Sequence, residues 1–245
     1  ITDTSFYFGS TSRDIEMNSQ RFQWSVFFSY GFRPFFLFAC IFAALSMGAW
    51  LAWIGLHAVN AQILRPTIAV PPHEWHAHEM LFGYSLAVIT GFFLTAVPNW
   101  TGAKPVNGTT LVILSGTWLA GRAAIWFSNY LPAELVAAVD LAFIPLLLVL
   151  VVKALFKRWA PRNFVFIPIL MLLFIANALA HAEWMELMDD VSGVAYRLAL
   201  GAVILLITII GGRVVPAFTT NALRRLGHER LPASHKPVDI LSVIS

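Results

Sequence analysis

Residues 76–97 read HAHEMLFGYSLAVITGFFLTAV, and Glu79 is the only charged side chain among these 22 residues. A helix needs roughly 20 predominantly apolar residues to cross the ~30 Å hydrocarbon layer of a bilayer. This stretch is long enough to do so, and it is too long and too continuous for a strand. Five further stretches are also predominantly apolar and long enough to cross the bilayer, namely 34–56, 110–130, 132–155, 163–182 and 193–215. The sequence therefore predicts an all-α, polytopic transmembrane bundle with six spans, contained within residues 31–220.

The composition of the whole chain indicates that a lipid bilayer is its main partner. Hydrophobic residues make up 58% of the 245 residues and charged residues only 12%, and the mean hydropathy is +0.73. A soluble domain carries about 25% charged residues. No soluble core can hide this much apolar surface, so the excess has to face lipid. The single cysteine, Cys40, lies in an apolar run, so neither a disulfide nor a thiolate metal cluster is expected.

The basic residues indicate how the chain is oriented in the membrane. Loops and ends on one side of the six spans carry 13 Lys and Arg, whereas loops on the other side carry 1. The positive-inside rule then places both chain termini in the cytoplasm. Residues 1–30 are expected to form a cytoplasmic segment, and residues 221–245 a basic tail or a linker to further spans. This topology explains the net charge of +3 and the pI near 9.3, so nucleic acid is not an expected partner.

Histidines gather at the outer edge of the predicted bundle. Five of the seven fall there, on three different helices: His57, His73, His76, His78 and His181. Neutral imidazole is the commonest metal ligand and also serves haem iron. Helical periodicity places His76 and Glu79 on one face and turns His78 about 200° away from His76. Asn177 lies one turn inward from His181. We therefore expect some of these side chains to hold a cofactor that is shared between helices.

The identity of the metal stays open at this level. The candidate metal ligands in this region are His73, His76, His78 and Glu79. Their spacing is not the zinc-protease motif, and imidazole suits Zn, Cu, Fe and Ni alike. The competing interpretation is that interfacial histidines reach lipid headgroups or donate to loop carbonyls, and it is preferred for His57. His228 and His235, in the cytoplasmic tail, are expected to be solvated.

Two charged residues lie well inside predicted spans. Arg122 and Asp140 are each nine residues from Leu131, in the turn that joins their spans, so they lie at similar depth. A charge at membrane depth is costly unless it is paired or hydrated, and it marks a site by default. One interpretation is a structural ion pair. The other is that Arg122, or Arg197 at the outer start of the last span, neutralises an anionic group such as a haem propionate.

Three compact motifs occupy the inner edge: residues 31–37 (GFRPFFL), 98–102 (PNWTG) and 211–220 (GGRVVPAFTT). Each alone is explained by interfacial anchoring, because Gly or Pro ends a helix and Arg or Trp sits at headgroup level. Together with residues 76–83 (HAHEMLFG), and in this order, they resemble the NnrS family of bacterial membrane proteins. The resemblance implies an inner-membrane protein of about twelve spans with haem b and copper, linked to the nitric oxide response and to denitrification. The six spans here would correspond to its N-terminal half.

The hypothesis from the sequence is a haem- and copper-binding protein of the bacterial inner membrane that senses or mitigates nitric oxide stress. His76 and His78 are the leading ligands, His73 and His181 are their partners, and Glu79 is close by. Whether the protein is an enzyme stays open; if it is, a haem-dependent membrane oxidoreductase is expected. Three alternatives remain. These are a transporter or channel that uses Arg122 and Asp140, a quinol-coupled oxidoreductase with a slot near Trp50 or Trp100, and a scaffold.

Overall fold

A computed structural model describes residues 23–59, 61, 67–158 and 160–227. Every regular element in these ranges is a helix, and no strand occurs among them. The prediction of an all-α polytopic membrane bundle is confirmed. Two histidines of the tail, His228 and His235, lie outside the described ranges. So do five of the basic residues counted for the orientation, namely Arg13, Arg21, Arg65, Arg230 and Lys236.

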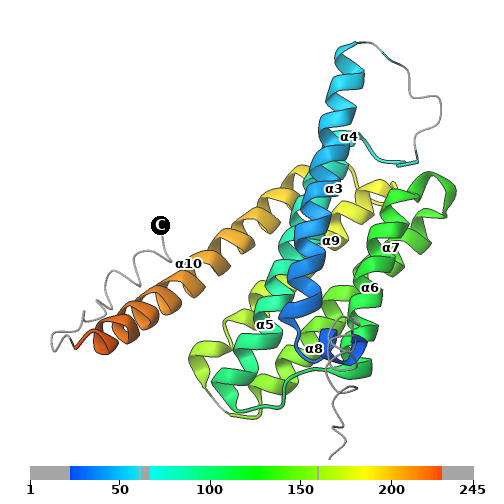
Figure 1. Cartoon of the computed structure of the whole chain (residues 1–245). Helices are drawn as coiled ribbons and strands as arrows, with labels where there is room; N and C mark the ends of the chain where they lie inside the picture. Colours follow the sequence, from blue (N-terminus) through cyan, green and yellow to red (C-terminus); the bar gives the residue numbers. More distant parts are fainter. Residues whose placement is uncertain (1–22, 60, 62–66, 159, 228–245) are drawn as a thin grey trace, which may run out of the picture.

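Five helical segments have the length and hydropathy of a membrane span (Figure 1). They are α3 (Phe32–Ala58), α4 (Pro72–His78) continued by η1 (Glu79–Ser85) and α5 (Leu86–Thr101), α7 (Ala133–Leu141) continued by α8 (Phe143–Leu155), η3 (Pro161–Asn163) continued by α9 (Phe166–Trp184), and α10 (Ser192–Arg225). The third predicted span forms α6 (Gly108–Trp126), whose hydropathy falls below that of these five because Arg122 and several hydroxyl side chains interrupt it. The short elements are α2 (Trp24–Phe27) and η2 (Ser128–Tyr130). The count of six spans and the orientation of the termini stay predictions.

Two spans change their helical geometry at one end of the bundle. In the second span the α-helix widens into the π-helical turn η1, which begins at Glu79. In the fourth span α7 ends at Leu141, and α8 begins at Phe143. Pro145 explains this second break, because its ring clashes with the carbonyl group four residues earlier, that of Leu141. Glu79 and Asp140 therefore both sit where regular α-helix is interrupted, and such interruptions are frequent at functional sites.

Apolar side chains fill most of the bundle interior, and a glycine allows one close helix contact. The main core cluster includes Phe35, Phe93 and Phe166, each fully buried. A Cβ atom at Gly91 would lie 2.7 Å from Cδ1 of Phe36, so glycine lets α5 approach α3. α10 packs on α9 through its first half, and its second half extends away from the other helices (Figure 1).

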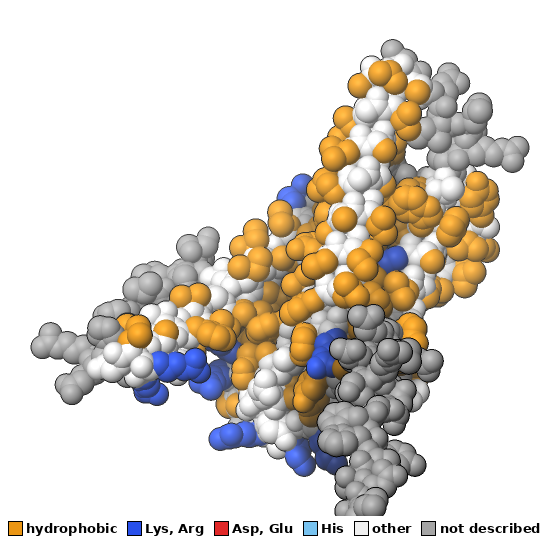
Figure 2. Space-filling view, in the orientation of Figure 1, with side chains coloured by type: hydrophobic (Ala, Val, Ile, Leu, Met, Phe, Trp, Pro, Cys, Tyr) orange, Lys and Arg blue, Asp and Glu red, His pale blue; other side chains and the backbone are white. Residues whose placement is uncertain are grey.

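Basic side chains gather at one end of the face shown in Figure 2. At this end Arg213 donates hydrogen bonds to Oδ1 of Asn163 at 3.2 Å and to the carbonyl oxygen of Arg162 at 2.6 Å. Its guanidinium also lies 5.1 Å from the ring centroid of Phe166. The arginine of the GGRVVPAFTT motif thus fastens α10 to the beginning of α9. This contact lies at the end opposite the histidines of α4.

Candidate metal centre

A cluster of six polar side chains is buried where four spans meet. We call it the buried polar cluster, and it consists of His78, Glu79, Arg122, Asp140, Asn177 and His181. These residues come from the end of α4, the start of η1, α6, α7 and α9. Each is less than 9% exposed, and His78 is completely buried. Because unpaired polar groups are costly in such surroundings, each of these side chains needs a partner.

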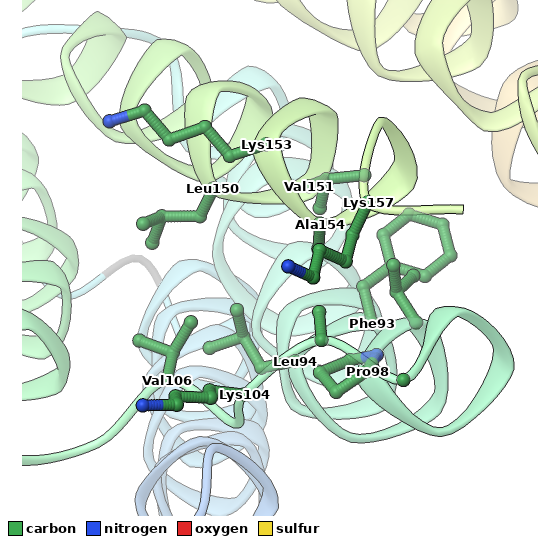
Figure 3. Close-up of a pocket in the computed structure, with 13 residues that line it drawn as sticks. Phe93, Leu94, Pro98, Lys104, Val106, Leu150, Val151, Lys153, Ala154 and Lys157 are labelled. Atoms are coloured by element: carbon green, nitrogen blue, oxygen red, sulfur yellow. The ribbon is translucent and has the colours of Figure 1, made fainter. Parts of the chain in front are cut away.

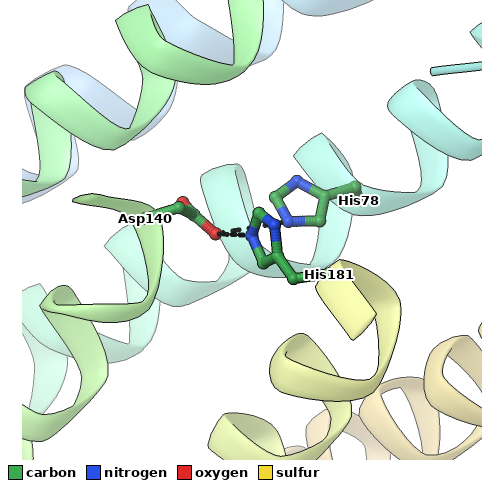
Figure 4. A group of neighbouring side chains, drawn as sticks. All are labelled: His78, Asp140 and His181. Atoms are coloured by element: carbon green, nitrogen blue, oxygen red, sulfur yellow. Dashed lines mark hydrogen bonds and ion pairs between the residues drawn. The ribbon is translucent and has the colours of Figure 1, made fainter. Parts of the chain in front are cut away.

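Asp140 lies at the centre of the cluster. Its Oδ2 accepts hydrogen bonds from Nδ2 of Asn177 at 2.9 Å and from Nε2 of His181 at 3.0 Å. Nε2 of His78 lies 3.4 Å from the same oxygen. Figure 4 shows Asp140, His78 and His181 facing one another from three different helices. The break between α7 and α8, next to Asp140, leaves this carboxylate facing α9.

Arg122 contacts both carboxylates of the cluster. One terminal nitrogen donates to Oε1 of Glu79 at 2.7 Å, and the other donates to Oδ1 of Asp140. The Arg122–Asp140 contact predicted from depth is therefore present, and Glu79 joins it. Two carboxylates face one guanidinium, so the cluster carries one excess negative charge before its histidines are counted. A metal cation, or a proton on an imidazole or a carboxylate, would balance this charge.

Three of these residues form a set of potential metal ligands. One nitrogen of His78, one nitrogen of His181 and one oxygen of Asp140 all lie within 4.8 Å of one another. The Asp140 oxygen is 3.4 Å from one imidazole nitrogen and 3.0 Å from the other. Neighbouring ligands of a tetrahedral ion with bonds of about 2.1 Å are roughly 3.4 Å apart. The donor set of two imidazoles and one carboxylate is therefore compatible with a transition-metal ion.

Residues outside this ligand set also contact His78 and Asp140. Nδ1 of His78 lies 3.0 Å from Oε1 of Glu79, and Nε2 lies 2.9 Å from Oδ1 of Asn177. A hydrogen bond that the ring N–H donates to a carboxylate fixes the orientation of a ligating imidazole and raises its basicity. Glu79 thus orients His78 through Nδ1, and Arg122 fixes the second oxygen of Asp140. Asn177 contacts Nε2, the nitrogen of His78 that faces Asp140, so a metal ion bound there would replace this contact.

The remaining predicted ligands lie elsewhere. His76 stacks on Trp50, with ring centroids 4.6 Å apart and planes 13° from parallel, and the stack continues through Trp53 to His57. His73 is exposed, with its Nε2 4.0 Å from Oε1 of Glu74. Arg197 is exposed near the start of α10. The structure therefore brings His78, His181, Glu79 and Arg122 together and leaves His73, His76 and Arg197 outside the cluster.

His76 and Glu79, which regular helical periodicity places on one face, contact different neighbours in the structure. Glu79 contacts His78 and Arg122, whereas His76 turns toward α3. Such periodicity holds only in a regular α-helix, and here the turn widens into η1 at Glu79. Asp140 as a ligand was also missed, although its depth next to Arg122 was a usable signal.

The stacked rings border a large apolar pocket at the same end of the bundle. Its volume is about 850 Å³, and it is lined in part by Trp50, Trp53, His57, Trp75 and Trp126. A slot near Trp50 was expected only for the quinol-coupled alternative. Trp100 was the other position expected for such a slot. There the aromatic rings pack on each other, since Trp100 stacks on Phe166 at a centroid distance of 5.6 Å.

Fold and site together define a multi-pass, all-helical membrane protein with a buried group of histidine and aspartate ligands. The chain belongs to the NnrS family, because the family model for the NnrS protein matches residues 26–245. The resemblance drawn from the four motifs is thereby confirmed. Neither the comparison with curated proteins nor the comparison with solved structures found a match.

Proposed function

We propose that the protein binds a transition-metal ion between His78, Asp140 and His181, and that it acts through this ion in the nitric oxide response of the bacterial inner membrane. The supporting observation is the meeting of three ligand atoms within 4.8 Å in a fully buried cluster. Family membership supports a membrane protein of the nitric oxide response. Copper is the metal that the family implies, and imidazole ligands suit it.

The chemistry follows from the number of protein ligands. Three protein ligands would leave one position open on a four-coordinate ion, as in metal sites that bind small molecules or substrates. A metal ion there supplies a binding position for a diatomic molecule such as nitric oxide. Burial of the three ligand residues would keep that position away from water. Glu79 holds the ring of His78 through Nδ1, while Arg122 offsets the repulsion between the two carboxylates.

Haem b, which the family also implies, does not fit between these three side chains. A porphyrin is far larger than the space between ligand atoms that lie within 4.8 Å of one another. The pocket of about 850 Å³ beside Trp50 has room for a planar ring, and His57 is in its wall. We place haem there in this proposal, with His57 or the neighbouring His76 as the ligand. A quinone ring would suit the same aromatic walls and is the second candidate for the pocket.

The first prediction concerns the metal content of the purified membrane protein. After loading with copper and removal of unbound ion, the wild type is expected to retain about one equivalent. His78→Ala and His181→Ala are each expected to lose most of it, because two protein ligands cannot hold the ion in its buried position. His73→Ala is the matched control, since it removes an exposed imidazole from the same helix as His78.

Elemental analysis and thermal unfolding in detergent give the readouts. Copper retained by a folded His78→Ala variant, or a folded wild type that binds neither Cu, Zn nor Fe, would contradict the proposal. An optical spectrum of the same preparations tests the haem position separately. Loss of a Soret band in His76→Ala or His57→Ala, with the band kept in His181→Ala, is the expected pattern.

A further inference from the structure

Three lysines surround a pocket at the end of the bundle that the positive-inside rule assigns to the cytoplasm (Figure 3). The pocket has a volume of about 410 Å³. Lys104 lies in the connection between α5 and α6, across the pocket from Lys153 and Lys157 at the end of α8. Apolar side chains, among them Leu94 and Val151, form the floor. The pocket is therefore amphipathic, with a cationic rim above an apolar base.

The described protein supplies no counter-ion to this rim. None of the three lysines forms an ion pair within residues 23–59, 67–158 or 160–227. The carboxylates in these ranges belong to the buried polar cluster or to segments near the opposite end, and they are Glu74, Glu79, Glu134, Asp140, Glu183, Glu186, Asp189 and Asp190. Three exposed lysines thus border one pocket without an ion-pair partner in the described residues.

We propose that this pocket binds the phosphate headgroup of an anionic membrane phospholipid, with part of an acyl chain on the apolar floor. Ammonium groups form charge-assisted hydrogen bonds with phosphate oxygens. Basic pockets between transmembrane helices on the cytoplasmic side are suited to lipid headgroups of this kind. Free phosphate would satisfy the lysines but would leave the apolar floor unused. The lipid joins the end of α5 to the end of α8, and this role is independent of the proposed metal site.

The test measures phospholipid binding to the intact, detergent-purified protein by native mass spectrometry. The probes are phosphatidylglycerol and phosphatidylcholine with identical acyl chains. The wild type is expected to bind one phosphatidylglycerol in preference to phosphatidylcholine. The double variant Lys104→Ala/Lys157→Ala is expected to bind phosphatidylglycerol roughly 30-fold more weakly, since each lysine contributes about 1 kcal/mol near a membrane surface. Ala154→Phe, which fills the pocket without changing its charge, is expected to displace the lipid as well.

The matched control is Arg224→Ala/Arg225→Ala, which removes the same charge from the end of α10, away from the pocket. It is expected to bind phosphatidylglycerol as the wild type does. An equal loss of binding in this control would overturn the proposal, because attraction would then follow total charge alone. Equal binding of the two lipids by the wild type would also overturn it. So would displacement of the lipid by an equimolar concentration of sodium phosphate, which would assign the pocket to free phosphate.

Discussion

Replacement of Arg122 by methionine is expected to lower the free energy of unfolding by about 3–5 kcal/mol, the usual cost of removing one partner from a buried ion pair. Arg122 is 8% exposed, and its terminal nitrogens contact both Glu79 and Asp140. Without it, two carboxylates remain buried with no guanidinium to neutralise them. The loss is measured by unfolding the protein in mixed micelles with increasing fractions of sodium dodecyl sulfate.

Two comparisons separate the buried charge from a general effect of losing an arginine. Arg197→Met removes the same group from an exposed position in α10 and is expected to change stability by less than about 1 kcal/mol. Adding Glu79→Gln and Asp140→Asn to Arg122→Met removes both orphaned charges and is expected to restore most of the lost stability. If Arg122→Met is no less stable than Arg197→Met, the ion pairs do not hold the helices together.

The membrane class and the depth of the charged residues were predictable, because both depend only on position along a span. An apolar stretch of about 20 residues fixes where a helix crosses the bilayer. Counting residues from the turn at Leu131 then places Arg122 opposite Asp140. The same reasoning put His78 and His181 at one edge of the bundle. These four residues are now in one cluster.

The direction in which each side chain points was not predictable. A span that is apolar on every face gives no periodic signal to separate its lipid-facing side from its core-facing side. His76 and His78 were therefore ranked together, although only His78 points into the bundle. The widening at η1 has no clear sequence signature, and it moved Glu79 away from His76. By contrast, Pro145 was a readable signal for the helix break beside Asp140.

Gly121→Ala is expected to destabilise the protein by about 1–3 kcal/mol, the usual range for overpacking a closely packed core. A Cβ atom at this position would lie 2.9 Å from Oδ1 and 3.3 Å from Cα of Asp140. Because Cα belongs to the backbone of α7, a change of rotamer cannot relieve the contact. The two helices would have to separate, and Asp140 would move away from Arg122 and His181. Metal retention is therefore expected to fall together with stability.

Gly116→Ala is the matched control for this substitution. Gly116 lies in the same helix, but a Cβ atom there would meet nothing within 4 Å. Alanine is a better helix former than glycine by about 1 kcal/mol, so the control is expected to be neutral or slightly stabilising. Thermal unfolding and copper content of the two variants are measured side by side. If both variants keep the unfolding temperature and the copper content of the wild type, close approach of α6 to α7 is not what positions Asp140. A loss confined to Gly121→Ala shows that a helix contact without any ligand atom positions the carboxylate of the metal centre.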